Sequence, residues 1–241
     1  MEHAADFASP TVRALRSDLA VALRAADHHG LSEGICNHFS VELPDGSDRF
    51  LINPRGLHWS EVGADDIVMV DAGGNKLAGR HEVEPTAMYI HAAVHRVARK
   101  ACVMHTHMPY ATALGCLKGV PFETGLSQTA MFFHGRVAVD GNYNGLALDV
   151  SEGERIARAM NGADIVFLAN HGVIVCGQRL DYTYNDLYYL ERACMTQIIA
   201  ASSGAPLAPV SANLAGHVAA QGAQERLQSE LFFESLRRRM R

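Results

Sequence analysis

Three histidines near the ends of two apolar segments are the residues of this sequence best suited to metal chemistry. His105 and His107 follow the apolar run 101–104, which is typical of a buried strand. Side chains alternate between the two faces of a strand, so these two imidazoles point the same way, about 6–7 Å apart along the backbone. The neutral imidazole is the commonest metal ligand in proteins, and this pair could therefore share one ion.

A third imidazole follows the second apolar run, 165–168, in the segment Asn170-His171-Gly172. Gly172 permits a tight turn, so His171 could reach the first pair from a neighbouring strand. Three imidazoles leave a coordination position open, which is typical of a catalytic metal. We therefore predict one divalent ion on His105, His107 and His171, with zinc favoured and manganese, cobalt or iron as alternatives. The competing interpretation is three ordinary histidines at strand ends.

Alternating strand and helix patterns around these histidines predict the elements that position them. Helices are expected at 9–30, 86–99, 109–117, 151–162, 181–203 and 211–239, the fourth of them opened by a capping box at 151–154. Strands are expected at 37–43, 49–53, 67–71, 101–107, 164–169 and 173–176, with a looser stretch at 118–150. Hairpins outnumber βαβ units, so the pattern favours an α/β fold with a mostly antiparallel sheet between helical layers.

Composition narrows the class of protein further. The chain of 241 residues has 48% hydrophobic and 20% charged residues, and no linker divides it, so we expect a single domain over 1–241. The formal charge of −5 argues against a nucleic-acid partner. No apolar run reaches the length of a membrane span, and the N-terminus lacks a signal-peptide pattern. Five widely spaced cysteines predict a reducing, cytoplasmic location rather than a disulfide framework.

Two segments of the sequence resemble a known family. HTHMPYATAL, which begins at His105, and LANHGVIVCG, which begins at Leu168, are similar to motifs of the class II aldolase and adducin family. The resemblance extends from about Thr11 to Gly204. It implies a three-layer α/β/α sandwich, usually assembled as a homotetramer, with a divalent ion held by the His-x-His pair and the later histidine.

The sequence departs from the sugar-phosphate aldolases of this family at their acid/base residue. Those enzymes carry Ser-Ser-Glu four residues before a helical histidine, whereas here Pro85-Thr86-Ala87 precedes His91. Ala87 cannot transfer a proton or bind a metal, although Glu82 or Glu84 could substitute from nearby. The family's catalytic tyrosine would fall near Gly125, where this sequence has no tyrosine.

The anion site implied by the resemblance is also altered. The aldolase phosphate cradle corresponds here to Asn37-His38-Phe39-Ser40 and Asn53-Pro54-Arg55-Gly56. Arg55 offers a planar, bidentate donor that suits a carboxylate, although a solvated loop residue is the alternative. We expect a small anionic substrate, bound by the residues Arg55, His38, Ser40, Gly56 and Thr86.

The function predicted from these observations is a divalent-metal-dependent carbon–carbon lyase. Decarboxylation of a small hydroxy- or oxo-carboxylate is favoured over cleavage of a sugar phosphate, because the aldolase Glu position is Ala87. A sugar-phosphate aldolase, a non-catalytic adducin-like assembly module and a non-haem iron oxygenase remain as alternatives.

The helix expected at 211–239 carries Phe232, Phe233 and Leu236, so we predict that it lies at an oligomer interface. His91 and His95 are interpreted as packing or surface residues.

Overall fold

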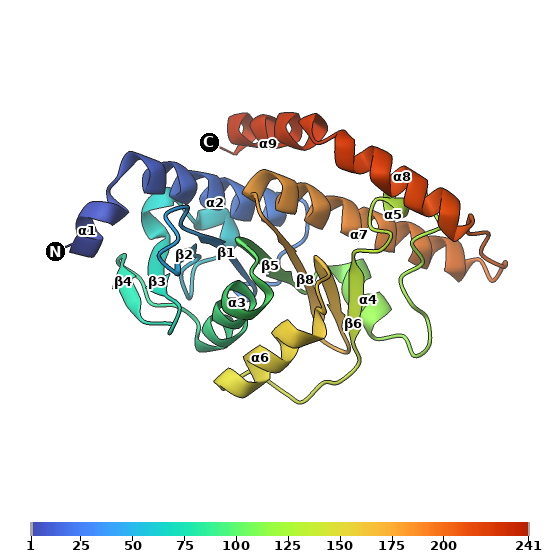
Figure 1. The fold of residues 1–241 in the computed structure, drawn as a ribbon, viewed down its shortest axis with the longest axis horizontal. Helices are drawn as coiled ribbons and strands as arrows, with labels where there is room; N and C mark the ends of the chain where they lie inside the picture. Colours follow the sequence, from blue (N-terminus) through green and yellow to red (C-terminus); the bar gives the residue numbers. More distant parts are fainter. Residues whose placement is uncertain (1, 241) are drawn as a thin grey trace.

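The computed structural model describes residues 2–240 and places all of their strands in one sheet (Figure 1). The strands are β1 (His38–Glu42), β2 (Arg49–Ile52), β3 (Val68–Asp71), β4 (Lys76–Ala78), β5 (Cys102–Thr106), β6 (Val137–Asp140), β7 (Ile165–Leu168) and β8 (Gly172–Gly177). Their order is β4-β3-β2-β1-β5-β8-β7-β6. Only the pair β6–β7 is parallel among residues 2–240, so the predicted, mostly antiparallel sheet is confirmed.

Helices cover both faces of this sheet. They are α1 (Glu2–Phe7), α2 (Pro10–His28), α3 (Pro85–Ala98), α4 (Pro109–Gly115), α5 (Gln128–Met131), α6 (Val150–Ala159), α7 (Leu180–Ser202), α8 (Ala212–Gln224) and α9 (Leu227–Arg239), with short 3₁₀ turns at Trp59–Glu61 and Ala64–Asp66. Helices α2 and α7 lie on one face, whereas α3 and α6 lie on the other (Figure 1). The predicted α/β/α layers are therefore present.

Successive side chains of the central strand β5 point alternately into the two helical layers, so each layer has its own part of the core. Met104 belongs to the cluster packed under α2 and α7, whereas Val103 belongs to the cluster formed with α3 and α6. Successive strand side chains point to opposite faces, so His105 points, like Val103, toward α3. His38 on β1 pairs with His105 in register and therefore lies on the same face. The sheet itself thus brings two imidazoles together beneath α3.

Several elements differ from the sequence-based expectation, and helix α1 and strand β4 were not expected at all. The single helix expected over 211–239 is wrong, because the chain breaks at Glu225–Arg226 into α8 and α9. The stretch 118–150, expected to be irregular, contains α5 and β6. The capping box expected at 151–154 is wrong: helix α6 begins at Val150, because the Asp149 side chain caps it by accepting the N–H of Glu152 at 2.9 Å. Among the described residues, none of the helices combines the length and apolarity that a membrane crossing requires.

Candidate metal centre

The structure brings the three histidines predicted as metal ligands into one cluster. His105 lies on β5, His107 directly follows that strand, and His171 lies in the turn between β7 and β8. Each offers a ring nitrogen, and these atoms all lie within 4.8 Å of one another. The ring centroids of His105 and His107 are 5.0 Å apart, and each centroid lies 4.8 Å from that of His171. One ion could therefore contact all three imidazoles.

The turn that carries His171 depends on two neighbouring residues. Asn170 has a left-handed backbone with φ of 57°, a conformation that asparagine tolerates better than most residues. Gly172 follows and lets β8 approach β5 closely: a Cβ atom there would lie 2.5 Å from the carbonyl oxygen of Thr106. It would also lie 2.7 Å from Cδ2 of His107. The Asn-His-Gly sequence thus sets the position of His171 against the His-x-His pair.

Hydrogen bonds from two of the rings leave their other nitrogen atoms for a ligand. His105 donates from Nδ1 to the carbonyl oxygen of Val173 at 3.1 Å. Nδ1 of His107 contacts the Glu33 carboxylate, which fixes that ring in the same way. Nε2 of His107 is buried and has no hydrogen-bond partner among residues 2–240. An orphaned imidazole nitrogen backed by a carboxylate is the arrangement found around protein-bound metals, so these residues fit a divalent ion.

Burial keeps the imidazoles of His105 and His171 in the neutral form that a metal requires. Burial lowers the pKa of His105 well below its usual value, and the nearby His171 lowers it further. Burial, followed by the proximity of His107, lowers the pKa of His171 to about 4. Neutral imidazole has a free lone pair, whereas the protonated ring has none. These two rings are therefore ready to coordinate a cation near neutral pH.

A cavity of about 340 Å³ opens beside the three histidines. It is lined by Ile35, Cys36, Asn37, His38, Arg55, Gly56, Glu84, Thr86, Ala87, Ile90, His91, His105, His107, Tyr143, Gly145, Leu146, Ala147 and His171. Apolar groups such as Ile90 and Leu146 stand among a few polar ones, as in small-molecule sites generally. The cavity is thus a pocket for a small ligand next to the metal cluster.

Four of the five residues predicted to bind substrate line this cavity. They are His38, Arg55, Gly56 and Thr86. Arg55 is exposed, and its Nε lies 3.2 Å from a carboxylate oxygen of Glu84. His38 is almost fully buried, and burial, followed by His107, lowers its pKa to about 3.

The fifth residue, Ser40, lies behind the pocket wall. Its hydroxyl contacts the imidazoles of His91 and His95, and its side chain is not part of the lining. Ser40 is therefore placed to support a pocket residue rather than to touch a ligand. The interpretation of His91 as a packing residue agrees with its complete burial, and His91 is in addition one of the residues that line the cavity.

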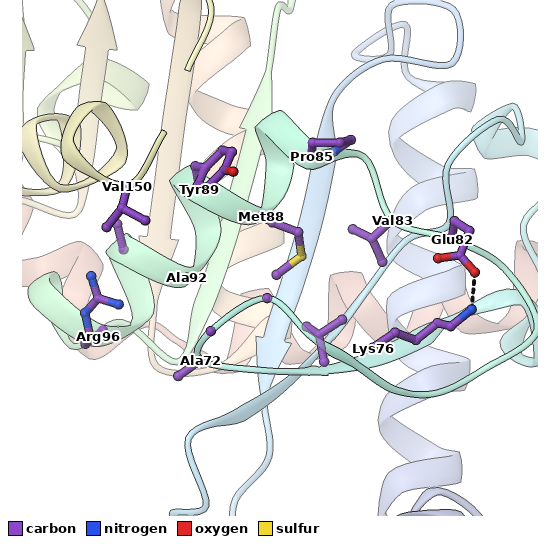
Figure 2. A pocket seen from close by; sticks show the side chains of 14 residues that line it. Ala72, Lys76, Glu82, Val83, Pro85, Met88, Tyr89, Ala92, Arg96 and Val150 are labelled. Carbon is purple, nitrogen blue, oxygen red and sulfur yellow. Dashed lines mark hydrogen bonds and ion pairs between the residues drawn. The ribbon is translucent and has the colours of Figure 1, made fainter. Parts of the chain in front are cut away.

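The two carboxylates proposed as substitutes for the missing aldolase Glu lie in different places. Glu84 lines the metal pocket and caps α3, where it accepts the N–H of Thr86 at 3.4 Å. Glu82 pairs with Lys76 in a separate hollow on another side of α3, together with Met88 and Arg96 (Figure 2). Of these two carboxylates, Glu84 is therefore the one that could act in the metal pocket.

Three further residues in or beside the pocket were not among the predicted site residues, although Asn37 belongs to the segment matched to the phosphate cradle. Glu33 backs His107, and Tyr143 places its ring centroid 6.1 Å from that of His171. Asn37 has φ of 73°, accepts the backbone N–H of His107 at 3.2 Å, and leaves its buried Nδ2 without a partner among residues 2–240. All three lie in loops, where hydrophobic periodicity does not indicate where a side chain points.

Comparison with known proteins agrees with this architecture. A family model described as the Class II Aldolase and Adducin N-terminal domain matches residues 17–198. A provisionally named aldolase class 2 protein of Pseudomonas aeruginosa is 37% identical over 194 residues, covering 80% of this chain and 73% of the relative. Decarboxylase NovR of Streptomyces niveus is 29% identical over 191 residues, covering 78% of this chain and 70% of the relative.

A solved structure shows the same fold over nearly the whole chain. It is an aldolase II superfamily protein from Pseudomonas syringae, with a TM-score of 0.89 and 30% sequence identity. The match covers 98% of this chain and 96% of that one. The resemblance noted in the His-x-His and Asn-His-Gly segments is thus confirmed. This chain belongs to the class II aldolase and adducin family.

Proposed function

We propose that this protein is a divalent-metal-dependent carbon–carbon lyase that decarboxylates a small hydroxy- or oxo-carboxylate. The observation that carries the proposal is the cluster of His105, His107 and His171 at the bottom of a ligand-sized pocket that lacks the aldolase Glu. The three histidines would hold the ion, with zinc favoured. When bound, such an ion supplies a Lewis acid for a substrate oxygen.

The residues around the cluster support a carboxylate substrate. Arg55 is the cationic side chain on the pocket wall, and its guanidinium could bind a carboxylate with two hydrogen bonds. Its present partner, Glu84, leaves other guanidinium nitrogens available. Asn37 adds a second donor, because its buried Nδ2 has no partner among the described residues. The apolar lining near Ile90 and Leu146 suits a hydrocarbon body better than a polyhydroxylated sugar.

Decarboxylation places few demands on the protein side chains. The carbon–carbon bond to the carboxylate breaks, carbon dioxide leaves, and the remaining carbon takes up one proton. Tyr143 and Glu84 are candidate proton donors on the pocket wall, because the first carries a phenol and the second a carboxyl group. No second acid/base group is required, which agrees with Ala87 at the aldolase Glu position. The similarity to Decarboxylase NovR supports the same reaction class.

Aldol cleavage of a sugar phosphate remains the second candidate. It is favoured by the position of Glu84 in the pocket, since a carboxylate there could replace the missing Glu as acid/base. In that case Glu84→Gln would abolish release of an aldehyde from sugar phosphates. A decarboxylase that uses Tyr143 instead would keep most of its carbon dioxide release in the same variant.

The first test is the metal content of the protein purified without chelator or metal-affinity tag. Elemental analysis of the wild type should find about one zinc or manganese ion per chain, and His107→Ala should lose it because one of three ligands is removed. A screen of hydroxy- and oxo-carboxylates for carbon dioxide release, beside sugar phosphates for aldehyde release, then assigns the reaction. Absence of metal from both proteins after reconstitution would contradict the lyase and favour a non-catalytic module.

A further inference from the structure

A chain of hydrogen bonds runs behind the metal pocket, from the backbone at Lys100 to the pocket wall at His91. Nδ1 of His95 lies 2.7 Å from the carbonyl oxygen of Lys100. The hydroxyl oxygen of Ser40 lies 2.7 Å from Nε2 of His95 and 2.6 Å from Nδ1 of His91. All three side chains are buried, so water does not compete for these contacts.

The backbone carbonyl at one end fixes the direction of every donor in the chain. A carbonyl oxygen only accepts, so Nδ1 of His95 carries the proton. His95 is neutral, because burial lowers its pKa to about 4, and its Nε2 is therefore an acceptor. The single proton of Ser40 is donated to that nitrogen. The hydroxyl oxygen must then accept from Nδ1 of His91, which leaves the lone pair of His91 on Nε2.

That lone pair has no partner among the residues that the structure describes. Nε2 of His91 is buried and makes no hydrogen bond with any residue from 2 to 240. The His91 imidazole lines the metal pocket, and Ala87, one turn earlier on α3, lines it with only a methyl group. A buried acceptor without a donor is unfavourable, so a group that enters the pocket gains by donating to it.

We propose that Nε2 of His91 accepts a hydrogen bond from a hydroxyl group of the bound substrate. Ser40 and His95 are positioning residues, because they hold the tautomer in which His91 is an acceptor. The proposal rests on the proposed function in one respect, since it takes the substrate to be a hydroxy-carboxylate. It also explains why Ser40 is part of the site without touching the pocket.

The tautomers of the two histidines provide the first test. In metal-free protein labelled with ¹⁵N-histidine, long-range proton–nitrogen correlation spectra should show protonated Nδ1 and bare Nε2 for both His91 and His95. His91→Gln and His95→Gln assign the resonances by removing them one at a time. A proton on Nε2 of His91 in the wild type would overturn the proposal, because that nitrogen would then be a donor.

Binding of matched acids provides the second test. Mandelate and 3-phenyllactate are compared with phenylacetate and 3-phenylpropionate, which lack only the hydroxyl, by titration calorimetry on metal-free protein so that chelation plays no part. The wild type should prefer at least one hydroxy acid by about tenfold, the factor expected for one buried hydrogen bond. His91→Phe should bind both members of the pair equally.

Two Ser40 variants separate positioning from a general loss of structure. Ser40→Ala should reduce the preference and mix the tautomers of His91, whereas Ser40→Thr keeps the hydroxyl and should restore both. The proposal is overturned if the wild type binds none of the acids or shows no preference for the hydroxy acids, as expected where water alone donates to Nε2. It is also overturned if that preference persists in His91→Phe. Failure to find metal or turnover would contradict the lyase alone, because neither measurement here uses the ion.

Discussion

The contact between Glu33 and His107 is the single-residue feature with the most direct bearing on metal affinity. The carboxylate holds the ring through Nδ1 and makes Nε2 a better ligand. We expect Glu33→Ala to weaken zinc binding by about 10- to 100-fold, the range typical for loss of such a partner. Competition with a chromophoric zinc chelator measures the change.

Glu225→Ala is the matched control for this measurement. Glu225 is exposed at the end of α8, far along the chain from the metal pocket, and its removal should leave zinc affinity unchanged. Equal affinities for Glu33→Ala and the wild type would show that Glu33 does not support the metal ligand.

His29 is the residue for which we expect a clear effect of pH on stability. Burial, followed by the charges of His28, Arg192 and Arg239, lowers its pKa from 6.5 to about 4, and its Nδ1 accepts from the Tyr184 hydroxyl at 2.8 Å. Between those pH values the unfolded chain binds a proton that the folded chain does not. The free energy of unfolding should therefore fall by roughly 2 kcal/mol as the pH drops from 6.5 to 4, allowing for partial exposure.

Urea denaturation of the wild type and His29→Gln at several pH values measures this contribution. Glutamine keeps an acceptor for the Tyr184 hydroxyl but does not titrate, so the loss of stability toward acid should be smaller in the variant. Parallel stability curves for the two proteins would argue against His29 as a source of acid sensitivity.

At the level of single residues, the spacing of the three histidines was enough to predict that they lie together. A strand fixes the direction of the His105 side chain, and a turn at a glycine limits the direction of the His171 side chain. Spacing could not predict Glu33, Asn37 or Tyr143. Their positions depend on loops folded over the sheet, and no local pattern says which loop residue reaches a distant site. Glu33, for example, contacts a histidine 74 positions further along the chain. Arg55 and Thr86 were found only through the family resemblance.

At the scale of elements, the close approach of β8 to β5 explains the glycine after His171. Gly172→Ala should destabilise the protein by about 1–3 kcal/mol, since the added Cβ overlaps the carbonyl oxygen of Thr106. It should also weaken metal binding, because relief of the overlap moves His107. Urea denaturation and zinc titration measure the two effects.

Gly141→Ala controls for the loss of a glycine near the same end of the sheet. A Cβ at Gly141 would have no neighbour within 4 Å, so its stability and zinc affinity should match those of the wild type. If Gly172→Ala behaved like this control, the packing of β8 against β5 would be looser than the structure shows.

The elements missed from the sequence share a physical cause. Helix α5 and strand β6 are four residues long each, too short for hydrophobic periodicity to show. The break between α8 and α9 falls at Glu225-Arg226, two residues that favour helices, so no local signal marks it. Arg226 instead pairs with Asp186 of α7 at 3.1 Å, a tertiary contact between distant parts of the chain. Long, strongly periodic elements such as α2 and α7 were predicted within a residue or two.

At the scale of the whole molecule, the C-terminal helices leave apolar side chains uncovered. Leu227 and Leu231 on α9 are more than half exposed, and Ala215 is the buried residue of α8. The predicted oligomer interface, in a homotetramer, rests on Phe232, Phe233 and Leu236, but Phe233 and Leu236 are buried within the chain's own core. Leu227 and Leu231 are instead the apolar side chains that such an interface could cover. Leu227→Glu with Leu231→Glu should therefore lower the assembly mass without unfolding the chain.

Light scattering coupled to size-exclusion chromatography measures that mass as multiples of 26.1 kDa. Far-ultraviolet circular dichroism checks that the double variant keeps its helices. An unchanged mass for the variant, or a monomeric wild type, would contradict an interface at this surface.

The metal ligands and the groups that face them belong to separate parts of the fold. His105, His107 and His171 are held by the sheet and its turns, whereas Ala87 and His91 lie one turn apart on α3. A substitution on that helical turn would change which proton carriers meet a substrate, while the strands and turns would continue to hold the three histidines together. Aldolases, decarboxylases and non-catalytic relatives could therefore diverge by a few substitutions in one helix, while the strands and turns that group the three histidines stay unchanged.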